Sequence, residues 1–176
     1  NFSQSACGFV LEFADVITTH NMNDTATNVG GWPASSMYTF VNNDIYNVIP
    51  DKIKNAIIDT TVVSGHGSTS GEENFTSTDK LYLLTPGEIY SDWSTYQYAN
   101  DTAKDLTRTL DYYTNIGVTT NYSGAIKKNG TSPARWWLRA SGSRANRNFF
   151  GVSSNGRYNT DYATYTYGVA PAFRLG

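Results

Sequence analysis

Two apolar, aromatic-rich motifs near the C-terminus decide how this sequence is interpreted. Residues 135–139 read Arg-Trp-Trp-Leu-Arg, and residues 168–175 read Gly-Val-Ala-Pro-Ala-Phe-Arg-Leu. Neighbouring side chains of a strand point to opposite faces, so the first motif predicts a central strand with Trp136 and Trp137 on its two sides. The second motif predicts a last strand that contains Pro171, which marks an edge or a bulge because proline lacks a ladder donor.

The segment between the two motifs, residues 141–170, has an unusual composition. It contains no Lys, Glu, Gln, Met or Trp and is rich in Ser, Gly, Asn, Tyr, Thr and Arg. Tyrosine offers a large amphipathic contact at low entropic cost, and Ser, Gly and Asn offer adaptable hydrogen bonds, as in binding surfaces. The missing residues are also those that codons ending in a pyrimidine cannot encode. Randomising the adenines of Asn codons would give this set of residue types. On composition alone, the alternative is a plain polar hairpin on the surface.

Together these features resemble the variable proteins of diversity-generating retroelements. The resemblance rests on Trp-Trp-Leu-Arg at 136–139, on the Asn-, Tyr- and Ser-rich run, and on the closing motif at 168–174. Upstream, Gly-Gly-Trp-Pro-Ala-Ser-Ser-Met at 30–37 and Ile-Ile-Asp-Thr-Thr-Val-Val at 57–63 are similar to an uncharacterised bacterial domain family with the same ending. The resemblance covers roughly residues 8–176.

This resemblance implies a fold and a division of the chain. It implies a C-type lectin-like fold of the α+β class, loop-rich, with a small antiparallel sheet flanked by two helices, as a single domain over residues 1–176. Residues 1–140 would be the scaffold, residues 141–170 the variable ligand-display segment, and residues 169–175 the closing strand. In that family a retroelement rewrites adenine positions of the variable repeat, and the fold displays the result.

Strand alternation combined with the retroelement pattern separates framework from display positions. The framework positions, apolar residues pointing inward and glycines in turns, are Phe149, Val152, Gly156, Ala163, Gly168, Val169 and Pro171. The positions expected to bind ligand, called the display set below, are Arg144, Asn146, Arg147, Asn148, Phe150, Arg157, Asn159, Thr160, Asp161, Tyr162, Thr164, Tyr165 and Tyr167. The alternative for Tyr162, Tyr165 and Tyr167 is packing against the Tyr-rich stretch 94–113.

Composition argues against several classes of protein. Charged residues make up 16% and aromatic residues 14% of the 176 residues, and the net charge is −2. Without a basic stripe, nucleic acid is not an expected partner, and no apolar run is long enough to span a membrane. Cys7 is the single cysteine, so neither an intrachain disulfide nor a cysteine metal cluster can form. We expect Cys7 to act as a small buried hydrophobe.

The expected partner is a protein or a glycan of unknown identity, and the sequence leaves the oligomeric state open. Because the chain begins at Asn1, we expect a processed or excised domain whose signal peptide or anchor lies outside it. A cell-surface, secreted or virion-associated location fits a display protein. A fixed-sequence structural or adhesive domain of a cell surface or tail fibre is the alternative.

No pattern of residues indicates catalysis, so we do not expect an enzyme. Ser-Gly-His-Gly-Ser at 64–68 is not a Gly-x-Ser-x-Gly elbow, and no nucleophile–base pair or phosphate loop is evident. Formylglycine-generating enzymes share the implied fold but use cysteine chemistry, which one N-terminal cysteine matches poorly. We expect no cofactor. Glu72, Glu73 and Asp79 leave a structural Ca²⁺ or Mg²⁺ site as an alternative to a solvated acidic loop.

Hydrophobic patterns predict further strands and loops. Strands are expected at residues 9–17, with Glu12 or Asp15 on an open face, and at 56–63 and 81–84. Loops are expected at 18–31, with His20 solvated, at 64–78 and over most of 94–110. The Asn155-Gly156 pair predicts a hairpin turn.

Helix signals are clear at two places. Pro33 favours a helix start, and apolar spacing continues to Ile49 with a break at Asn42-Asn43, after which Asp51 would cap a short turn. A capping box at 85–88 starts a second helix that runs to about Trp93. Arg139 and Arg174, which border the apolar motifs, are expected to be buried structural arginines.

Overall fold

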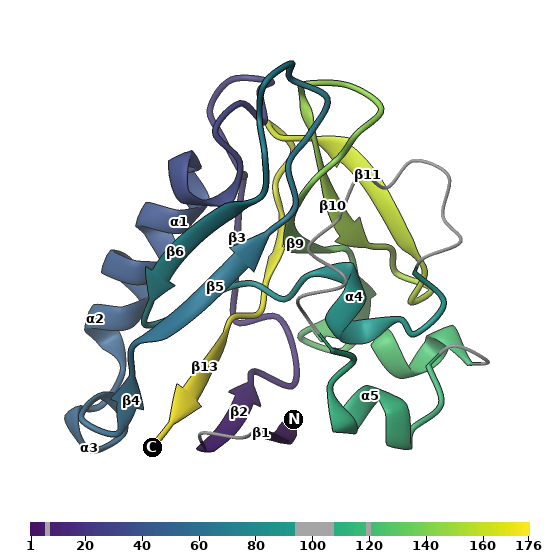
Figure 1. The fold of residues 1–176 in the computed structure, drawn as a ribbon. Coiled ribbons are helices and arrows are strands. Elements are labelled where there is room, and N and C mark those ends of the chain that lie inside the picture. The colour runs from purple at the N-terminus through teal and green to yellow at the C-terminus, as the bar shows by residue number, and fades with distance from the viewer. Residues whose placement is uncertain (6–7, 94–107, 119–120) are drawn as a thin grey trace.

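The computed structural model of the protein describes residues 1–5, 8–93, 108–118 and 121–176. Two sheets meet end to end, with helices on both sides and the two termini at the same end of the molecule (Figure 1). The α+β class is confirmed. Cys7 and most of the Tyr-rich stretch lie outside the described residues, as do the predictions made for them. No helix among the described residues is long and apolar enough to cross a membrane.

The larger sheet has five strands in the order β11-β10-β9-β12-β3. These strands are Tyr158–Tyr162, Asn148–Val152, Trp136–Ser141, Tyr167–Val169 and Thr18–His20. The prediction of a central Trp-Trp strand is confirmed, because β9 lies in the middle and all six of its residues are buried. The expectation of a purely antiparallel sheet is wrong. After β11 the chain crosses to the far side of β9, so β12 runs parallel to β9.

The smaller sheet has the order β1-β2-β13-β4. Its strands are Phe2–Ser5, Gly8–Glu12, Ala172–Leu175 and Ile57–Ile58. The predicted last strand is therefore divided between two sheets, with β12 in the larger one and β13 in the smaller one. Pro171 stands at the interruption, where its missing N–H costs no ladder hydrogen bond.

Two hairpins complete the strands. They are formed by β5 with β6 and by β7 with β8, which span Thr60–Ser64, Phe75–Asp79, Lys127–Asn129 and Ser132–Ala134. The prediction of a loop throughout 64–78 is wrong, because β6 pairs residue by residue with β5. The sequence of β6 is polar and mostly half-buried or exposed, so it carries no apolar alternation that would reveal a strand.

A run of short helical turns covers one side of the sheets (Figure 1). The turns are a 3-10 helix at Trp32–Ala34, α1 at Ser36–Thr39, a π-helix at Phe40–Ile45, α2 at Tyr46–Val48 and α3 at Asp51–Lys54. The predicted break at Asn42-Asn43 falls within the π-helix. The predicted cap before α3 is wrong by one residue, because Pro50 holds that position.

Helices on the other side are equally short. They are α4 at Pro86–Ile89, α5 at Asp111–Asn115 and a 3-10 helix at Tyr122–Ala125. The capping box at Thr85 and Glu88 is confirmed, although α4 ends four residues before Trp93. Residues 81–84 are buried as predicted but form no regular strand. An isolated bridge joins Tyr82 to Ala172, and the carbonyl of Leu84 accepts from the N–H of Arg139 in β9.

Side chains of the central strand connect it to both sides of the molecule. Trp136 donates from Nε1 to the carbonyl of Ala125 (3.1 Å), and Trp137 donates from Nε1 to the carbonyl of His20 (3.1 Å). His20 is thus part of β3 and stacks on Phe40 with ring centroids 4.1 Å apart. The prediction of a loop at 18–20 is wrong, because these residues pair with β12, and His20 is half-buried instead of solvated.

The two arginines that border the motifs differ. Arg139 is 1% exposed; it pairs with Glu88 (2.6 Å) and donates to the carbonyls of Leu83 and Val63. Its prediction as a buried structural arginine is confirmed. Arg174 is only partly buried.

A second buried ion pair connects the N-terminal strand to the rest of the core. Lys127 and Glu12 are 3.2 Å apart with side chains 2% exposed, and Lys127 also donates to the carbonyls of Phe13 and Ala14. Tyr113 donates to the same carboxylate at 2.5 Å. Burial lowers the pKa of Lys127 and raises that of Tyr113. Of the two residues predicted for an open face, Glu12 is buried, because its side chain turns inward to Lys127, whereas Asp15 is exposed beyond the end of β2.

Replacing Lys127 by Ala should lower the free energy of unfolding by about 3–5 kcal/mol, because it leaves the Glu12 carboxylate buried without its cation. Urea denaturation measures this. Lys128→Ala, next to it on the same strand but exposed, is the control and should change stability by less than about 0.5 kcal/mol. Equal effects of the two variants would show that the buried pair is not a major stabilising contact.

Candidate binding face

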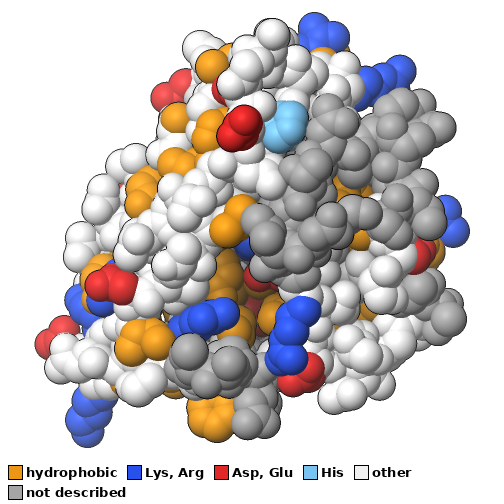
Figure 2. Space-filling model, viewed as in Figure 1, with side chains coloured by type: hydrophobic (Ala, Val, Ile, Leu, Met, Phe, Trp, Pro, Cys, Tyr) orange, Lys and Arg blue, Asp and Glu red, His pale blue; other side chains and the backbone are white. Residues whose placement is uncertain are grey.

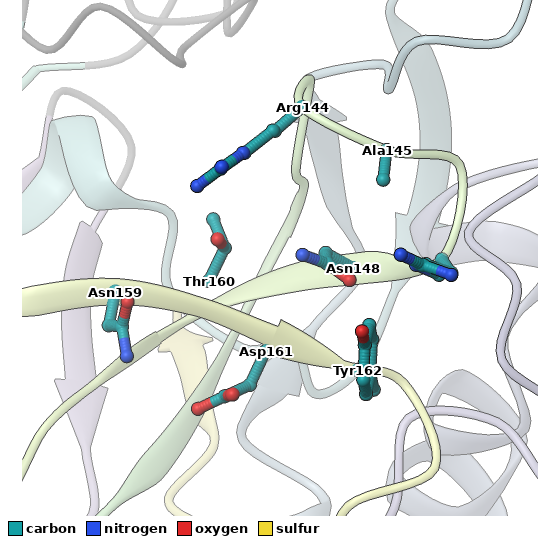
Figure 3. Close-up of a pocket in the computed structure, with 8 residues that line it drawn as sticks. Arg144, Ala145, Asn148, Asn159, Thr160, Asp161 and Tyr162 are labelled. Carbon is teal, nitrogen blue, oxygen red and sulfur yellow. The ribbon is translucent and has the colours of Figure 1, made fainter.

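A pocket of about 540 Å³ opens between the loop that joins β9 to β10 and the edge strand β11. Figure 3 shows Arg144 directed from the loop toward Thr160 on one side of β11, with Asp161 on the other side. The residues that line the pocket are Arg144, Ala145, Arg147, Asn148, Asn159, Thr160, Asp161 and Tyr162. Apart from Ala145, each of them belongs to the display set. Composition and strand pattern therefore selected residues that the fold brings together.

The other members of the display set, apart from Phe150, occupy three kinds of position. Asn146 and Tyr165 are exposed and lie close in sequence to residues that line the pocket. Thr164 and Tyr167 are partly buried. Arg157 is exposed but lies away from the pocket lining, with its guanidinium 5.1 Å from the centre of the Tyr122 ring. The predicted framework positions are all buried.

Phe150 is the one member of the display set that the structure contradicts. Its side chain is 0% exposed and meets Trp93 edge-on, with ring centroids 4.8 Å apart. Its neighbour Phe149 is also fully buried, against the other face. The prediction is wrong because both faces of β10 are covered, so alternation does not bring either ring to solvent here. A bulge in the β9–β10 pairing lies between Phe149 and Gly151.

Three tyrosines form a row beside the pocket. The Tyr162 and Tyr165 ring centroids are 5.5 Å apart, and those of Tyr165 and Tyr167 are 6.1 Å apart, both edge-on. An arginine lies over each end of the row: Arg147 is 4.8 Å from the Tyr162 ring, and Arg135 is 5.5 Å from the Tyr167 ring. We refer to this arrangement as the tyrosine row. It extends the pocket into an amphipathic surface.

Arg135 is a functional candidate that the sequence analysis missed. Its Nη1 lies 2.6 Å from the Asp161 carboxylate and donates to the Tyr167 hydroxyl at 3.2 Å, while that hydroxyl donates to Asp161 at 2.9 Å. Burial, and then Asp161, raise the pKa of Tyr167. Arg135 is the first residue of the Trp-Trp motif and lies outside the segment of unusual composition, so its sequence position gave no sign of a role in binding. Its contacts fix two members of the display set.

The loop that carries Arg144 and Arg147 is held by one buried side chain. Asn28 is 0% exposed, and its Nδ2 lies 3.0, 3.1 and 2.7 Å from the carbonyl oxygens of Gly142, Ala145 and Asn148. Its backbone N–H donates to the carbonyl of Asn146 at 2.8 Å. Every one of these acceptors is a main-chain oxygen. Asn28 therefore fixes the path of the loop without contacting its outward side chains.

Main-chain hydrogen bonds hold the turn after β11 in the same manner. The N–H of Ala163 donates to the carbonyl of Arg147 at 2.9 Å, and the N–H groups of Met22 and Asn23 donate to the carbonyl of Ala163. The loop 21–31 thus supports both halves of the candidate face. No sequence pattern predicts a role for this loop, because a single Asn in a polar stretch is not marked as buried.

Two of the three acidic residues considered for a cation have other partners, and the third, Glu73, is exposed. Glu72 accepts from the N–H of Gly30 at 2.7 Å, and Asp79 accepts from Trp32 Nε1 at 2.8 Å. Burial raises the pKa of Asp79. In the part of the chain that the structure describes, no three residues of the kinds that ligate metals gather in one place.

The chemistry of the face is that of recognition by hydrogen bonds, charge and aromatic contact. Its lining offers guanidinium, amide, hydroxyl and phenol groups, together with one carboxylate that Arg135 already engages.

The sequence model of one family, described as "Domain of unknown function (DUF6273)", matches residues 9–176, and the chain belongs to this family. No curated protein and no solved structure gives a significant match.

Replacing Asn28 by Ala should destabilise the protein by about 2–4 kcal/mol, because buried carbonyls of the loop lose their donor. Urea denaturation measures the change, and amide hydrogen exchange should rise most at residues 142–148. Asn146→Ala, an exposed change on the loop itself, serves as the matched control with less than about 0.5 kcal/mol expected. Wild-type exchange in the Asn28 variant would contradict this role.

Proposed function

We propose that this chain is a non-catalytic ligand-binding protein that displays a variable surface. The surface consists of the pocket, the tyrosine row and the exposed part of the loop 142–148. The observation that carries the proposal is the composition of the pocket. All of its lining residues except Ala145 belong to the display set, which was chosen for its residue types and strand positions. Tyrosine and arginine are also the side chains that dominate binding energy at protein surfaces.

The fold that best accommodates this function is the C-type lectin type, as the resemblance of the end motifs implies. Two features of the structure support it. The closing strand joins the two sheets and brings the termini together, and the candidate face stands at the opposite end (Figure 1). A display face far from the termini suits attachment of the domain to a cell surface or a virion, which is the location we propose.

Diversification by a retroelement is the mechanism that we propose for the variation. It is supported by the way the scaffold holds the face. Asn28 and the loop 21–31 contact residues 142–148 and Ala163 through the main chain, so many outward side chains can change without loss of these bonds. Phe149 and Phe150 are buried within the same segment, which restricts the tolerated changes to the outward positions.

One observation favours a fixed-sequence adhesive or structural domain as the second candidate. Asp161 and Tyr167 bond to each other and to Arg135. Two members of the display set are thus committed to contacts that most other residues could not make. In a fixed site such a network would be maintained, whereas in a diversified site it would be particular to this sequence.

Sequencing of the gene and its flanking DNA from many isolates tests the proposal. We expect the codons for Arg144, Asn146, Arg147 and Asn159 to vary wherever a nearby template repeat has adenine. Buried Phe149 in the same segment and residues 136–139 are internal controls and should stay constant. Absence of a template repeat, with all these codons invariant, would reject diversification and leave a fixed binding or packing surface.

A further inference from the structure

We propose that the pocket accepts an acidic side chain, Asp or Glu, of a protein ligand. The inference rests on the proposed function only for the use of this face in binding, and its chemistry comes from the residues themselves. Arg144 and Arg147 both line the pocket. Basic side chains stand at the upper edge of the molecule, over the loop between β9 and β10, although the chain as a whole carries a charge of −2 (Figure 2).

The positive charge of Arg147 is not cancelled within the described part of the chain. Asp161 is the acidic residue of the lining, and Arg135 and Tyr167 already engage its carboxylate at 2.6 and 2.9 Å. No described carboxylate lies within ion-pair distance of Arg147. A carboxylate that enters the pocket would therefore meet a guanidinium without an acidic partner.

The geometry of Arg147 suits a carboxylate. Its guanidinium lies over the Tyr162 ring, with 4.8 Å between the guanidinium carbon and the ring centroid. A guanidinium carries five N–H donors in a planar fork, and the attraction of its charge to a ring does not consume them as hydrogen-bond donors. Those donors match the two oxygens of a carboxylate, and charge-assisted bonds of this kind are stronger than neutral ones.

The tyrosine row favours a protein over an acidic saccharide. Sugar rings bind best against a flat, open aromatic face. Here one face of Tyr162 is covered by Arg147, and the rings of the row meet at 63° and 64°. Tyr162 and Tyr165 are 37% and 43% exposed, which suits contact with the irregular surface of a protein.

The test is an NMR titration of the whole ¹⁵N-labelled chain with three small probes. These are N-acetylglutamate α-amide, the uncharged N-acetylglutamine α-amide, and glucuronate. We expect the glutamate probe to shift the amides of residues 144–148 and 159–162, and the glutamine probe to leave them unchanged. Arg147→Gln should weaken binding of the glutamate probe about three- to tenfold.

Lys52→Gln is the charge-matched control, because Lys52 is an exposed cation on α3. It should bind the glutamate probe as the wild type does. Equal shifts with the glutamate and glutamine probes, or unchanged binding in Arg147→Gln, would overturn the inference. If glucuronate shifted the same amides at a lower concentration than the glutamate probe, the ligand would be an acidic saccharide and the protein source would be rejected.

The titration and the gene survey can reject the two proposals separately. A variable gene together with a pocket that binds no acid would leave the proposed function intact and remove only the ligand class. An invariant gene together with selective glutamate binding would give a fixed acid-recognition site and remove only the diversification.

Discussion

The candidate face depends on the hydrogen bonds between Asn28 and the main chain of the loop 142–148. Because the acceptors are carbonyl oxygens, the path of the loop is set by a buried amide and not by the outward side chains. Leaving a buried carbonyl without a hydrogen bond costs free energy, so these bonds also hold the loop in one conformation. A surface built in this manner can be rigid and still differ in its chemistry from one sequence to another.

Behind the face, the central strand and its neighbours supply a rigid support. Phe149 and Phe150 fill the two sides of β10, and Trp93 covers Phe150. Trp137 lies against Tyr167 with ring centroids 4.8 Å apart. The tyrosine row thus begins on the buried core and ends in solvent. A ligand that contacts the row would meet side chains whose inner ends are already fixed, which lowers the entropic cost of binding.

The sequence was most informative where local chemistry decides the structure. The Trp-Trp strand, the capping box at Thr85 and the buried framework of the display segment follow from side-chain alternation and helix capping, and each was predicted. Residues of the pocket lining were also predicted, because their composition is unusual and continuous in sequence. Such signals need no knowledge of which distant segment lies opposite.

Structure could not be predicted from the sequence where partners distant in the chain decide it. The strands β3 and β6 are short and polar, and only their pairing with β12 and β5 makes them strands. Glu12 is buried because Lys127 reaches it from 115 residues away, and Asn28 is buried because the loop 142–148 closes over it. Phe150 was assigned to the surface because alternation cannot show that both faces of a strand are covered. Arg135 was missed for a related reason, since its partners Asp161 and Tyr167 come from other strands.

The central claim is that the outward side chains of the face are independent of the stability of the fold. The most direct measurement is urea denaturation of a variant in which Arg144, Asn146, Arg147 and Asn159 are all replaced by Ser. The account predicts a free energy of unfolding within about 1 kcal/mol of the wild type, whereas Phe150→Ser in the same segment should lose about 3–5 kcal/mol. A loss of several kcal/mol in the fourfold variant would contradict the claim and make these side chains part of the fold.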